Sequence, residues 1–372
     1  MTKIVHIITG LGSGGAERVL YQLVRRSATK HGRAHIVISL SGEGFYGGPL
    51  RSAGAIVHTL GMRPNRPPIF EFCRLVYLLR RIRPEVVMTW LYHADLVGTF
   101  AAKLAGTRRI IWNLRCSEFV FSDHPPMTGR IVALLARLSR MPTVVAVNSI
   151  AGQRDHIRLG YDPKQWAYLP NGFDTTEWTP DENGRAKVRA ELGLTSSDFV
   201  VARAGRVDPQ KDFPTFIAAI RMLVPRWPSL RFALLGQGTE QLELPPDIER
   251  SALVLGLRGD MCEVIRAFDL VVSSSAYGEG LPNIVAESMA SGVPCVVTDV
   301  GDSALLVGDS GIVVPPNDPY ALAEAIQSMM TMPVEQLEQL GARARERVEA
   351  NYSLATSLDR YDEIFKSAAV GD

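Results

Sequence analysis

The sequence contains few cysteines and lacks a long apolar segment. Only four cysteines occur in 372 residues, and no two of them form a Cys-x-x-Cys pair. This spacing is against a disulfide framework or a structural zinc site, so we expect reduced, mostly buried thiols. No apolar run reaches the roughly 18–20 residues of a membrane-spanning helix. The first residues also lack the charged and apolar regions of a signal peptide, and we therefore expect a cytoplasmic protein.

No Asp-x-Asp motif occurs anywhere in the chain. The sequence therefore offers no obvious site for a divalent metal, and we expect neither a metal nor a cofactor. Cationic side chains and the N-termini of helices can take the place of a metal beside an anionic ligand. We also expect no nucleic-acid partner.

A glycine turn near the start follows the first expected strand and opens a helix. Gly10, Gly12 and Gly15 fit the Gly-x-Gly-x-x-Gly spacing, which lets the backbone approach an anion at a helix N-terminus. A dinucleotide site would also need an acidic residue after the second strand, and residues 35–41 contain none, which is against a dehydrogenase. Two interpretations remain: Gly14 and Gly15 contact a phosphate or an acceptor, or the tight turn binds no ligand.

The formal net charge of +1 hides an asymmetry between the two halves of the chain. Residues 1–175 contain 23 Lys and Arg against 10 Asp and Glu, whereas the remainder contains 17 against 29. A basic first half would suit an anionic acceptor or an anionic lipid surface. The alternative is that both halves are ordinary solvated surfaces that differ in charge.

Short apolar runs alternate with helix-length stretches along the whole chain. This alternation predicts an α/β fold with parallel sheets covered by helices on both faces. The length predicts two domains, and the turn-rich segment 169–174 and the polar stretch 175–184 mark the hinge. We expect doubly wound domains over 1–172 and 173–351, with ligands in a cleft at the carboxyl ends of the strands. The expected strands are 3–8, 35–40, 86–88, 109–112, 143–147, 199–202, 231–235, 253–255, 270–273, 294–298 and 311–314.

The stretch 277–294 contains two glutamates with seven residues between them. Glu279 precedes an expected helix and Glu287 lies about one turn inside it, with Pro282 near the first helical position, which proline favours. A carboxylate can accept hydrogen bonds from both hydroxyls of a vicinal diol, so Glu287 would suit a ribose. The alternative is a surface glutamate and a helix glutamate in ion pairs, which does not explain Gly280.

These residues resemble the Glu-x7-Glu signature of retaining glycosyltransferases with the GT-B fold, the family 4-like group. Residues 202–212 are similar to the Gly-Arg-x4-Lys segment of that group, with Arg206 and Lys211 as its two basic residues. The resemblance extends over nearly the whole chain and implies two Rossmann-like domains with a cleft between them. It places Arg206 and Lys211 on the donor diphosphate, where fixed cations stabilise the charge of the leaving group. It also places Glu279 on the donor sugar and Glu287 on the ribose.

Weaker matches extend the implied donor site to two glycine-containing loops and to the start of the helix that carries the second glutamate. By this resemblance the last helix returns to the first domain, so we expect residues 352–372 to belong to that domain. The further donor contacts that the resemblance implies are Gly236, Arg258, Gly280, Leu281, Pro282 and Asn283.

The acceptor side is expected in the first domain, where residues 88–98 join a strand to a helix. By resemblance this segment brings a histidine near the reacting sugar, so His93 would help to carry the acceptor proton, with Asp95 as a second candidate. The alternatives are that His93 satisfies a backbone group and that Asp95 caps the helix. Residues 113–118 follow the next strand and are further candidates for acceptor contacts.

Two basic amphipathic stretches, 70–83 and 129–140, mix Leu, Ile and Val with arginines. Helices of this kind lie on anionic membranes, or they present a solvated face above a core. The sequence favours neither interpretation. Peripheral contact with the inner face of the cytoplasmic membrane therefore stays an open alternative.

Together these features predict a metal-independent glycosyltransferase that uses a UDP-, GDP- or similar nucleotide sugar. It would act with retention on a saccharide or lipid-linked acceptor, in the synthesis of a bacterial surface polysaccharide or glycolipid. The alternatives are a GT-B sugar-nucleotide epimerase or phosphorylase, and a non-catalytic protein that binds sugar nucleotides. We expect Lys211→Ala to lower turnover much more than it lowers fold stability.

Overall fold

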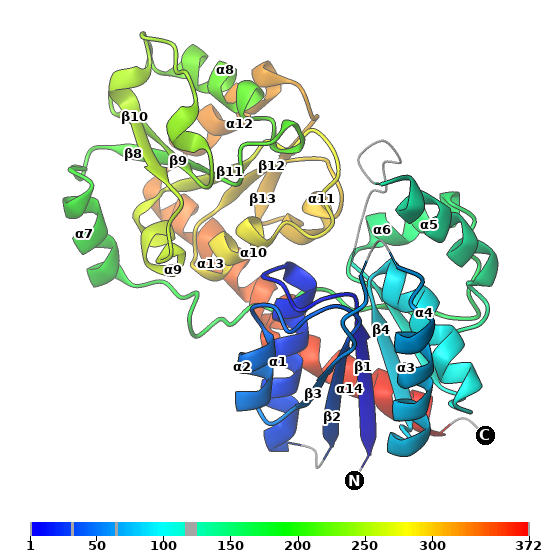
Figure 1. The fold of residues 1–372 in the computed structure, drawn as a ribbon. Coiled ribbons are helices and arrows are strands. Elements are labelled where there is room, and N and C mark those ends of the chain that lie inside the picture. The colour runs from blue at the N-terminus through cyan, green and yellow to red at the C-terminus, as the bar shows by residue number, and fades with distance from the viewer. Residues whose placement is uncertain (1, 31–32, 64–65, 116–124, 371–372) are drawn as a thin grey trace. The chain divides into compact units, whose positions relative to one another are not determined.

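The computed structural model describes residues 2–30, 33–63, 66–115 and 125–370. It divides into two compact units, which we call unit 1 (Met1–Pro170 with Ser357–Asp372) and unit 2 (Asn171–Thr356). Figure 1 shows the elements of both units in chain order. Each unit has one parallel sheet with helices on both of its faces, which confirms the expected α/β class.

Unit 1 contains a seven-stranded parallel sheet in the order β3-β2-β1-β4-β5-β6-β7. Successive residues of a strand point to opposite faces, and β1 shows this well. Val5 and Ile7 enter one core, whereas Ile4 and Ile8 enter the other. The strands are β1 Lys3–Ile8, β2 Ala34–Ser39, β3 Ile56–Thr59, β4 Val86–Trp90, β5 Ile110–Leu114, β6 Val144–Val147 and β7 Trp166–Tyr168.

The helices of unit 1 cover the two faces of this sheet with their apolar sides. Leu75, Ala101 and Val132 pack into the same core, so α3, α4 and α5 share one face. Leu20 and Tyr361 pack into the other core, so α1 and α14 share the opposite face. The helices are α1 Gly15–Lys30, α2 Gly47–Ser52, α3 Ile69–Ile82, α4 Tyr92–Leu104, α5 Pro126–Leu138, α6 Ile150–Arg158 and α14 Leu354–Val370.

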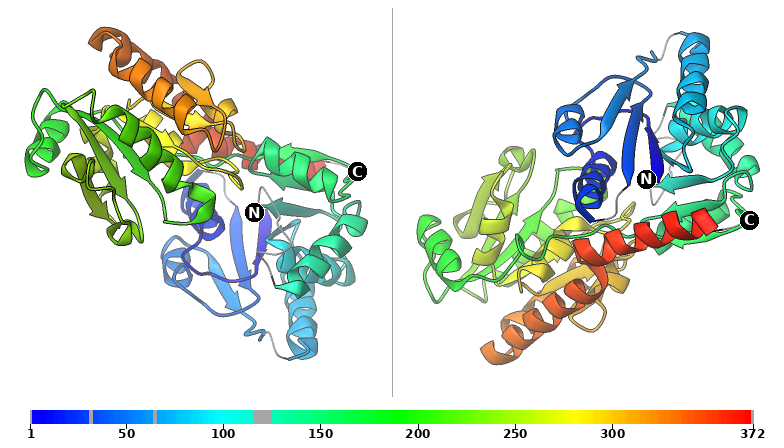
Figure 2. Two further views of the ribbon diagram at one scale, coloured as in Figure 1. Left: turned by 90° about the horizontal axis from the view of Figure 1, so that it is seen from above. Right: turned by 90° about the horizontal axis from the view of Figure 1, so that it is seen from below.

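The last helix, α14, is fastened into unit 1 by buried polar contacts. The Tyr361 hydroxyl accepts hydrogen bonds from Arg115 Nη2 at 2.9 Å and Asn113 Nδ2 at 3.3 Å. Arg33 forms a buried ion pair with Asp362 on the same helix. Figure 2 shows α14, in red, beside the strands of unit 1. Helix α14 therefore fills part of the same core as β1, although the two elements lie far apart in the sequence.

Unit 2 repeats this plan with six parallel strands in the order β10-β9-β8-β11-β12-β13. Its strands are β8 Phe199–Ala204, β9 Leu230–Leu235, β10 Ala252–Gly256, β11 Leu270–Ser273, β12 Cys295–Thr298 and β13 Gly311–Val314. Its helices are α7 Glu182–Glu191, α8 Phe213–Leu223, α9 Met261–Val264, α10 Asn283–Ala290, α11 Ser303–Val307, α12 Pro319–Met330 and α13 Val334–Tyr352. Short 3-10 turns are η2 Pro209–Lys211, η3 Thr239–Gln241, η4 Glu249–Ser251 and η5 Ile265–Ala267.

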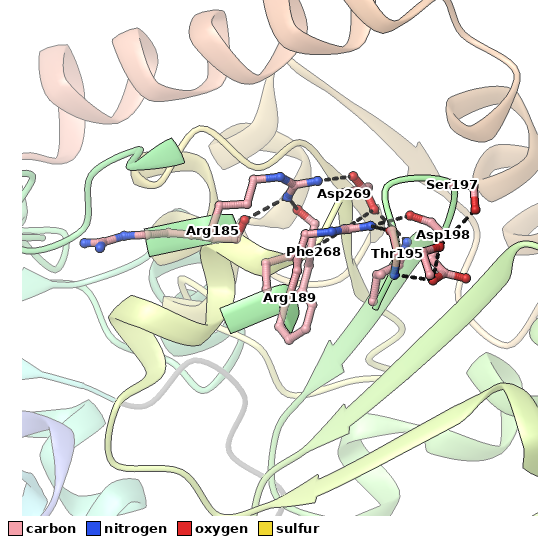
Figure 3. A network of polar contacts seen from close by, with 10 residues as sticks. Arg185, Arg189, Thr195, Ser197, Asp198, Phe268 and Asp269 are labelled. Atoms are coloured by element: carbon pink, nitrogen blue, oxygen red, sulfur yellow. Dashed lines mark hydrogen bonds and ion pairs between the residues drawn. The ribbon is translucent and has the colours of Figure 1, made fainter. Parts of the chain in front are cut away.

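A polar network holds α7 against the amino ends of β8 and β11, as Figure 3 shows. Arg189 donates to the carbonyl oxygens of Ala267 at 2.9 Å and Asp198 at 2.6 Å. Asp269 pairs with Arg185 and also accepts the backbone N–H of Val200 at 2.7 Å. These contacts satisfy backbone groups at the amino ends of the strands and hold α7 there. They do not involve the loops at the carboxyl ends of the strands.

The structure differs from the sequence predictions at several points. β3 and β7 are short, partly exposed strands that were not expected. The units divide between Pro170 and Asn171, inside the turn-rich segment 169–174. The stretch 175–184 lies inside unit 2, where Trp178 is part of the core and the last residues start α7. Among the described cysteines, Cys295 is buried, Cys262 is half-buried and Cys73 is exposed, so the expectation of mostly buried thiols was wrong. Cys116 lies outside the described residues. In the described part of the chain, no helix is both long and apolar enough to cross a membrane.

Candidate active site

The predicted donor residues of unit 2 follow the carboxyl ends of four adjacent strands. The strand order reverses between β8 and β11, and crevices at such a reversal are where doubly wound sheets bind ligands. Arg206 and Lys211 follow β8, Gly236 follows β9 and Arg258 follows β10. The stretch 279–283 follows β11 and leads into α10, which carries Glu287. Strand order alone therefore brings the two halves of the sequence motif together.

The loop after β8 is shaped by two aspartates. Asp208 accepts the backbone N–H of Gln210 at 3.0 Å and starts the turn η2, which ends at Lys211. Asp208 also pairs with Arg206 at 2.9 Å, and these contacts, with the backbone hydrogen bond first, lower its carboxyl pKa. Asp212 adopts a left-handed conformation with φ 46° and caps α8 by accepting the N–H of Thr215. These caps fix the direction in which Lys211 leaves the loop.

The central contact of the site is an ion pair between Lys211 Nζ and Glu279 Oε1. Glu279 is only 8% exposed, and its Oε1 also accepts the Ser275 hydroxyl at 2.6 Å. Arg206 lies on the same loop as Lys211, but 62% of its side chain is exposed. The structure thus places Lys211 directly against Glu279 and leaves Arg206 reaching toward solvent.

Two backbone contacts hold the loop that carries Glu279. The N–H of Ala276 donates to the Gln210 carbonyl at 2.9 Å, which joins the loops after β8 and β11. The N–H of Asp302 donates to the Gly280 carbonyl at 2.8 Å. A Cβ at Gly301 would lie 2.1 Å from the Glu279 carbonyl oxygen, and its φ is +64°, so only glycine allows this approach. The carboxylate is therefore presented from a braced loop.

The other residues of this stretch take different positions around α10. Leu281 is buried, and Pro282 is the N-cap residue, one position before the helix starts. Asn283 is exposed, and its Oδ1 accepts a hydrogen bond from Asn171 at 2.8 Å. Glu287 is buried to about nine-tenths, one turn into the helix.

Gly236 and Arg258 lie in the loops that follow the adjacent strands β9 and β10. Gly236 has φ +119°, and a Cβ there would lie 2.1 Å from the Gly205 carbonyl oxygen. This close approach brings the backbones after β8 and β9 into contact beside Arg206. Arg258 pairs with Asp260 through two hydrogen bonds, from Nε at 2.8 Å and from Nη2 at 2.5 Å, so its charge is compensated in the loop after β10.

Arg203, a buried arginine that the sequence analysis did not consider, holds the loop that carries Lys211 in place. Arg203 is almost fully buried at the end of β8 and donates to the carbonyl oxygens of Lys211 and Ala204 and to the Ser274 hydroxyl. Its guanidinium also stacks on the Phe213 ring at 4.9 Å. Burial lowers its pKa to about 10, so it remains charged at neutral pH. The signal was an arginine within an otherwise apolar strand.

The candidates in unit 1 lie at the equivalent place, after the neighbouring strands β1 and β4. Gly14 and Gly15 open α1 in an exposed turn, and a Cβ at Gly14 would contact the Glu17 side chain. His93 is the second residue of α4 and is half-buried, and burial lowers its pKa, which favours the neutral imidazole. The preceding Leu91 has φ 72°, a strained conformation for a residue with a side chain. Of residues 113–118, those from 116 onward lie outside the described residues.

Asp95 differs from both interpretations offered for it. It is fully buried, and Thr89 Oγ1 donates to its Oδ1 at 2.5 Å. It does not cap α4, whose N-cap residue is Leu91 and which has no side-chain cap. Its Oδ2 has no hydrogen-bond partner among the described residues, and burial raises its pKa to about 8. Asp95 therefore lies in the core beneath the first turn of α4, which also carries His93, and has no exposed surface with which to touch a ligand.

A cavity in unit 2 lies away from these residues. It has a volume of about 700 Å³ and is lined by α7, the start of α13 and residues such as Arg185, Phe268 and Asp269. These residues stand at the amino ends of β8 and β11, opposite the predicted donor residues. The carboxyl ends of the strands are the candidate ligand site, because the charged side chains and the braced loops converge there. Residues 2–30, 33–63, 66–115 and 125–370 contain no group of three His, Cys, Asp or Glu side chains that could hold a metal ion.

Two family models match the chain and together account for most of it. Residues 198–332 match "Glycosyl transferases group 1", and residues 13–177 match "Glycosyltransferase Family 4". The Escherichia coli UDP-Gal:alpha-D-GlcNAc-diphosphoundecaprenol alpha-1,3-galactosyltransferase is 22% identical over 78% of this chain and 77% of its own length. The D-inositol 3-phosphate glycosyltransferase of Rhodococcus opacus is 30% identical over 74% of this chain, which spans 64% of that relative.

Solved structures show the same fold. The crystal structure of Anabaena HepE in complex with UDP superposes with a TM-score of 0.85 and 21% identity, covering 98% of this chain and 100% of that one. HepE in complex with UDP-glucose gives a TM-score of 0.79. At this identity the likeness establishes the fold, which agrees with the two Rossmann-like units.

Proposed function

The chain belongs to the group 1 and family 4 glycosyltransferases of the GT-B fold, and we propose that it transfers a sugar from a nucleotide-diphosphate donor to a saccharide or lipid-linked acceptor. One observation carries this proposal: the Lys211 ammonium and the Glu279 carboxylate meet where the strand order of unit 2 reverses. A donor presents an anionic diphosphate next to a sugar rich in hydroxyls. A cation beside a carboxylate matches that pair of groups.

The ion pairs of the site suggest how the donor is bound. Lys211 is paired with Glu279, and Arg206 with Asp208, so each cation already has an anionic partner. We propose that the diphosphate takes over both cations. Glu279 is then free to accept hydrogen bonds from the sugar hydroxyls, while Glu287 accepts those of the ribose. Binding of the diphosphate and orientation of the sugar would be coupled through one salt bridge.

The proposed reaction breaks the bond between the anomeric carbon and the diphosphate oxygen and forms a bond to the acceptor oxygen. Arg206 and Lys211 stabilise the negative charge that develops on the leaving diphosphate, without a metal ion. We propose a same-face displacement with retention, in which the leaving phosphate helps to accept the proton of the acceptor hydroxyl. The proton ends on the leaving diphosphate, and the neutral imidazole of His93, whose pKa is lowered by burial, is proposed to relay it there.

The substrate class and the place of action are also proposals. HepE binds UDP and UDP-glucose, which makes uridine nucleotides the first donors to test. The Escherichia coli relative acts on a diphosphoundecaprenol-linked sugar, which supports a lipid-linked acceptor. We propose a role in bacterial surface polysaccharide or glycolipid synthesis, with the enzyme in the cytoplasm at the inner face of the cytoplasmic membrane.

A thermal-shift screen of UDP, GDP and their sugars would identify the donor, and product analysis with that donor would test the activity. The contacts of Lys211 make Lys211→Gln a better test than Lys211→Ala. Lys211→Ala would leave the buried Glu279 carboxylate without its cation, which costs stability as well as turnover. Lys211→Gln keeps a hydrogen-bond donor for Glu279 and removes only the charge.

We expect Lys211→Gln to lower kcat roughly 100- to 1,000-fold, the usual effect of losing one group that stabilises transition-state charge. Lys187→Gln is the matched control, because Lys187 lies on α7 of the same unit and is 74% exposed. Wild-type turnover in Lys211→Gln would refute the diphosphate assignment. An epimerised donor, a released sugar phosphate, or binding without turnover would instead identify the epimerase, phosphorylase or binding-protein alternatives.

A further inference from the structure

Three neighbouring helices of unit 1 expose large apolar side chains. Helices α3, α4 and α5 pack side by side, because α4 contacts both of the others and all three bury their inner sides in one core. Figure 1 shows α3 and α4 next to each other on the same side of the sheet. Their outer sides together form one surface, which we call the α3–α5 face.

On α3, aromatic and cationic residues alternate along one side of the helix. Phe70, Arg74, Tyr77 and Arg81 are spaced by four, three and four residues, which places them in one row. Phe70 is 78% exposed and Tyr77 is 60% exposed, and both arginines are exposed. Leu75 and Leu79 point to the core instead, so the apolar residues of this row are not needed for packing within unit 1.

The same pattern continues on the two neighbouring helices. Leu104 and Lys103 are exposed at the end of α4, where Arg80 of α3 donates to the Leu104 carbonyl at 3.0 Å. On α5, Met127 is exposed beside Arg130, one turn further along the helix. Large apolar side chains thus recur among cations across the whole face.

The charge of the α3–α5 face is almost entirely positive. The carboxylates of these three helices are Glu71 and the buried Asp95. Within the described ranges, the arginines at 74, 81, 130 and 137 take part in no ion pair. These cations are therefore available to an external anionic partner.

We propose that the α3–α5 face docks on an anionic phospholipid bilayer. Phosphate head groups would meet the arginines while Phe70, Tyr77 and Met127 enter the interface between head groups and acyl chains. A nucleic acid would use the cations but would leave the exposed apolar side chains in water, so the mixture favours a lipid surface. This inference rests on the proposed function, which has the enzyme act on a lipid-linked acceptor at the inner face of the cytoplasmic membrane, and it names the surface that would contact that membrane.

Sedimentation of the full chain with vesicles tests the proposal. One set contains phosphatidylcholine and phosphatidylglycerol in equal parts, and the other contains phosphatidylcholine alone. Each cation near an anionic surface strengthens binding roughly fivefold, so Arg74→Gln with Arg81→Gln should weaken binding to the anionic vesicles about 25-fold. Phe70→Ser with Tyr77→Ser should weaken it at least about tenfold, since two inserted aromatic rings are lost.

The matched control changes equivalent residues of unit 2. Tyr320 on α12 is 71% exposed and Arg226 is exposed, so Tyr320→Ser with Arg226→Gln removes one exposed aromatic ring and one exposed cation from the other unit. This control should bind vesicles as the wild type does. All variants should keep the wild-type melting temperature and the wild-type thermal shift with nucleotide, which separates failure of the docking from failure of the proposed function.

Three outcomes would overturn the proposal. The first is equal binding of both vesicle sets, or of neither. The second is binding that the α3 variants leave unchanged. The third is that the arginine variant loses vesicle binding, the aromatic variant keeps it, and the wild type also binds duplex DNA. That result would mean that the face binds polyanions in general.

Discussion

The buried carboxyl group of Asp95 makes the stability of unit 1 depend on pH. Burial raises its pKa from 3.8 to about 8 in the folded chain, against the hydrogen bond from Thr89, which acts in the opposite direction. Between these two pH values the folded chain keeps a proton that the unfolded chain has lost. Folding stability therefore falls as pH rises through this window and levels off above pH 8.

Asp95→Asn removes this titration and keeps a carbonyl oxygen that can accept the Thr89 hydroxyl. One pH unit corresponds to about 1.4 kcal/mol, so at neutral pH the proton linkage should cost the wild type on the order of 4 kcal/mol. The amide also has a fixed cost, because its NH₂ occupies the place of Oδ2, for which no partner is found in the described part of the chain. That cost does not change with pH, so the prediction concerns the slope and not the absolute stability.

The assay is urea unfolding of wild type and Asp95→Asn at several pH values from about 5 to about 8. The variant should gain stability relative to the wild type by on the order of 1 kcal/mol per pH unit. Asp162→Asn is the matched control, because Asp162 lies in the same unit with 71% of its side chain exposed. If the wild type and Asp95→Asn lose stability in parallel as pH rises, the carboxyl is already ionised in the folded chain and the reasoning is wrong.

Three further predictions follow from contacts in the two units. Gly236→Ala should abolish the nucleotide-induced thermal shift and cost at least about 2 kcal/mol, because its Cβ would meet the Gly205 carbonyl. Arg203→Met should cost about 3–5 kcal/mol in urea unfolding, since it removes a buried cation bonded to the Lys211 carbonyl, whereas Arg203→Lys should recover part of the stability but not kcat. Tyr361→Phe should lower unfolding stability by about 1–3 kcal/mol, because two buried donors lose their acceptor. Wild-type values in any of these measurements would contradict the contact concerned.

The fold was largely predictable because both sheets are parallel and covered on both faces. Buried strands then read as continuous apolar runs, and β1, β11 and β13 have the bounds that the runs predict. β7 is different: Trp166–Tyr168 is three residues long and half-buried, so its strand conformation depends on pairing with β6. β3 is likewise an edge strand without a buried side, and no local pattern marks it.

The site was predictable where its chemistry is contained in short motifs. The sequence around Lys211 and the sequence around Glu279 each predict a loop after a strand. The strand order brings the two loops together. Arg203 was not predictable as a support, because its partners are backbone carbonyls and Ser274, which the fold alone brings near. Asp95 was misjudged for a similar reason, since a helix-start aspartate usually caps, whereas here Thr89 and the core enclose it.

The chain enters unit 2 at Asn171 and leaves it at Thr356, so unit 2 is a continuous stretch while unit 1 is made from both ends of the sequence. During synthesis, unit 2 can fold as soon as its own residues have left the ribosome. Unit 1 must wait for Tyr361 and Phe365, which fill the core beside Ile4 and Trp90. The strands of unit 1 that precede Asn171 are therefore translated before unit 2 but are completed after it, and a chain that stops before Tyr361 would have an open core.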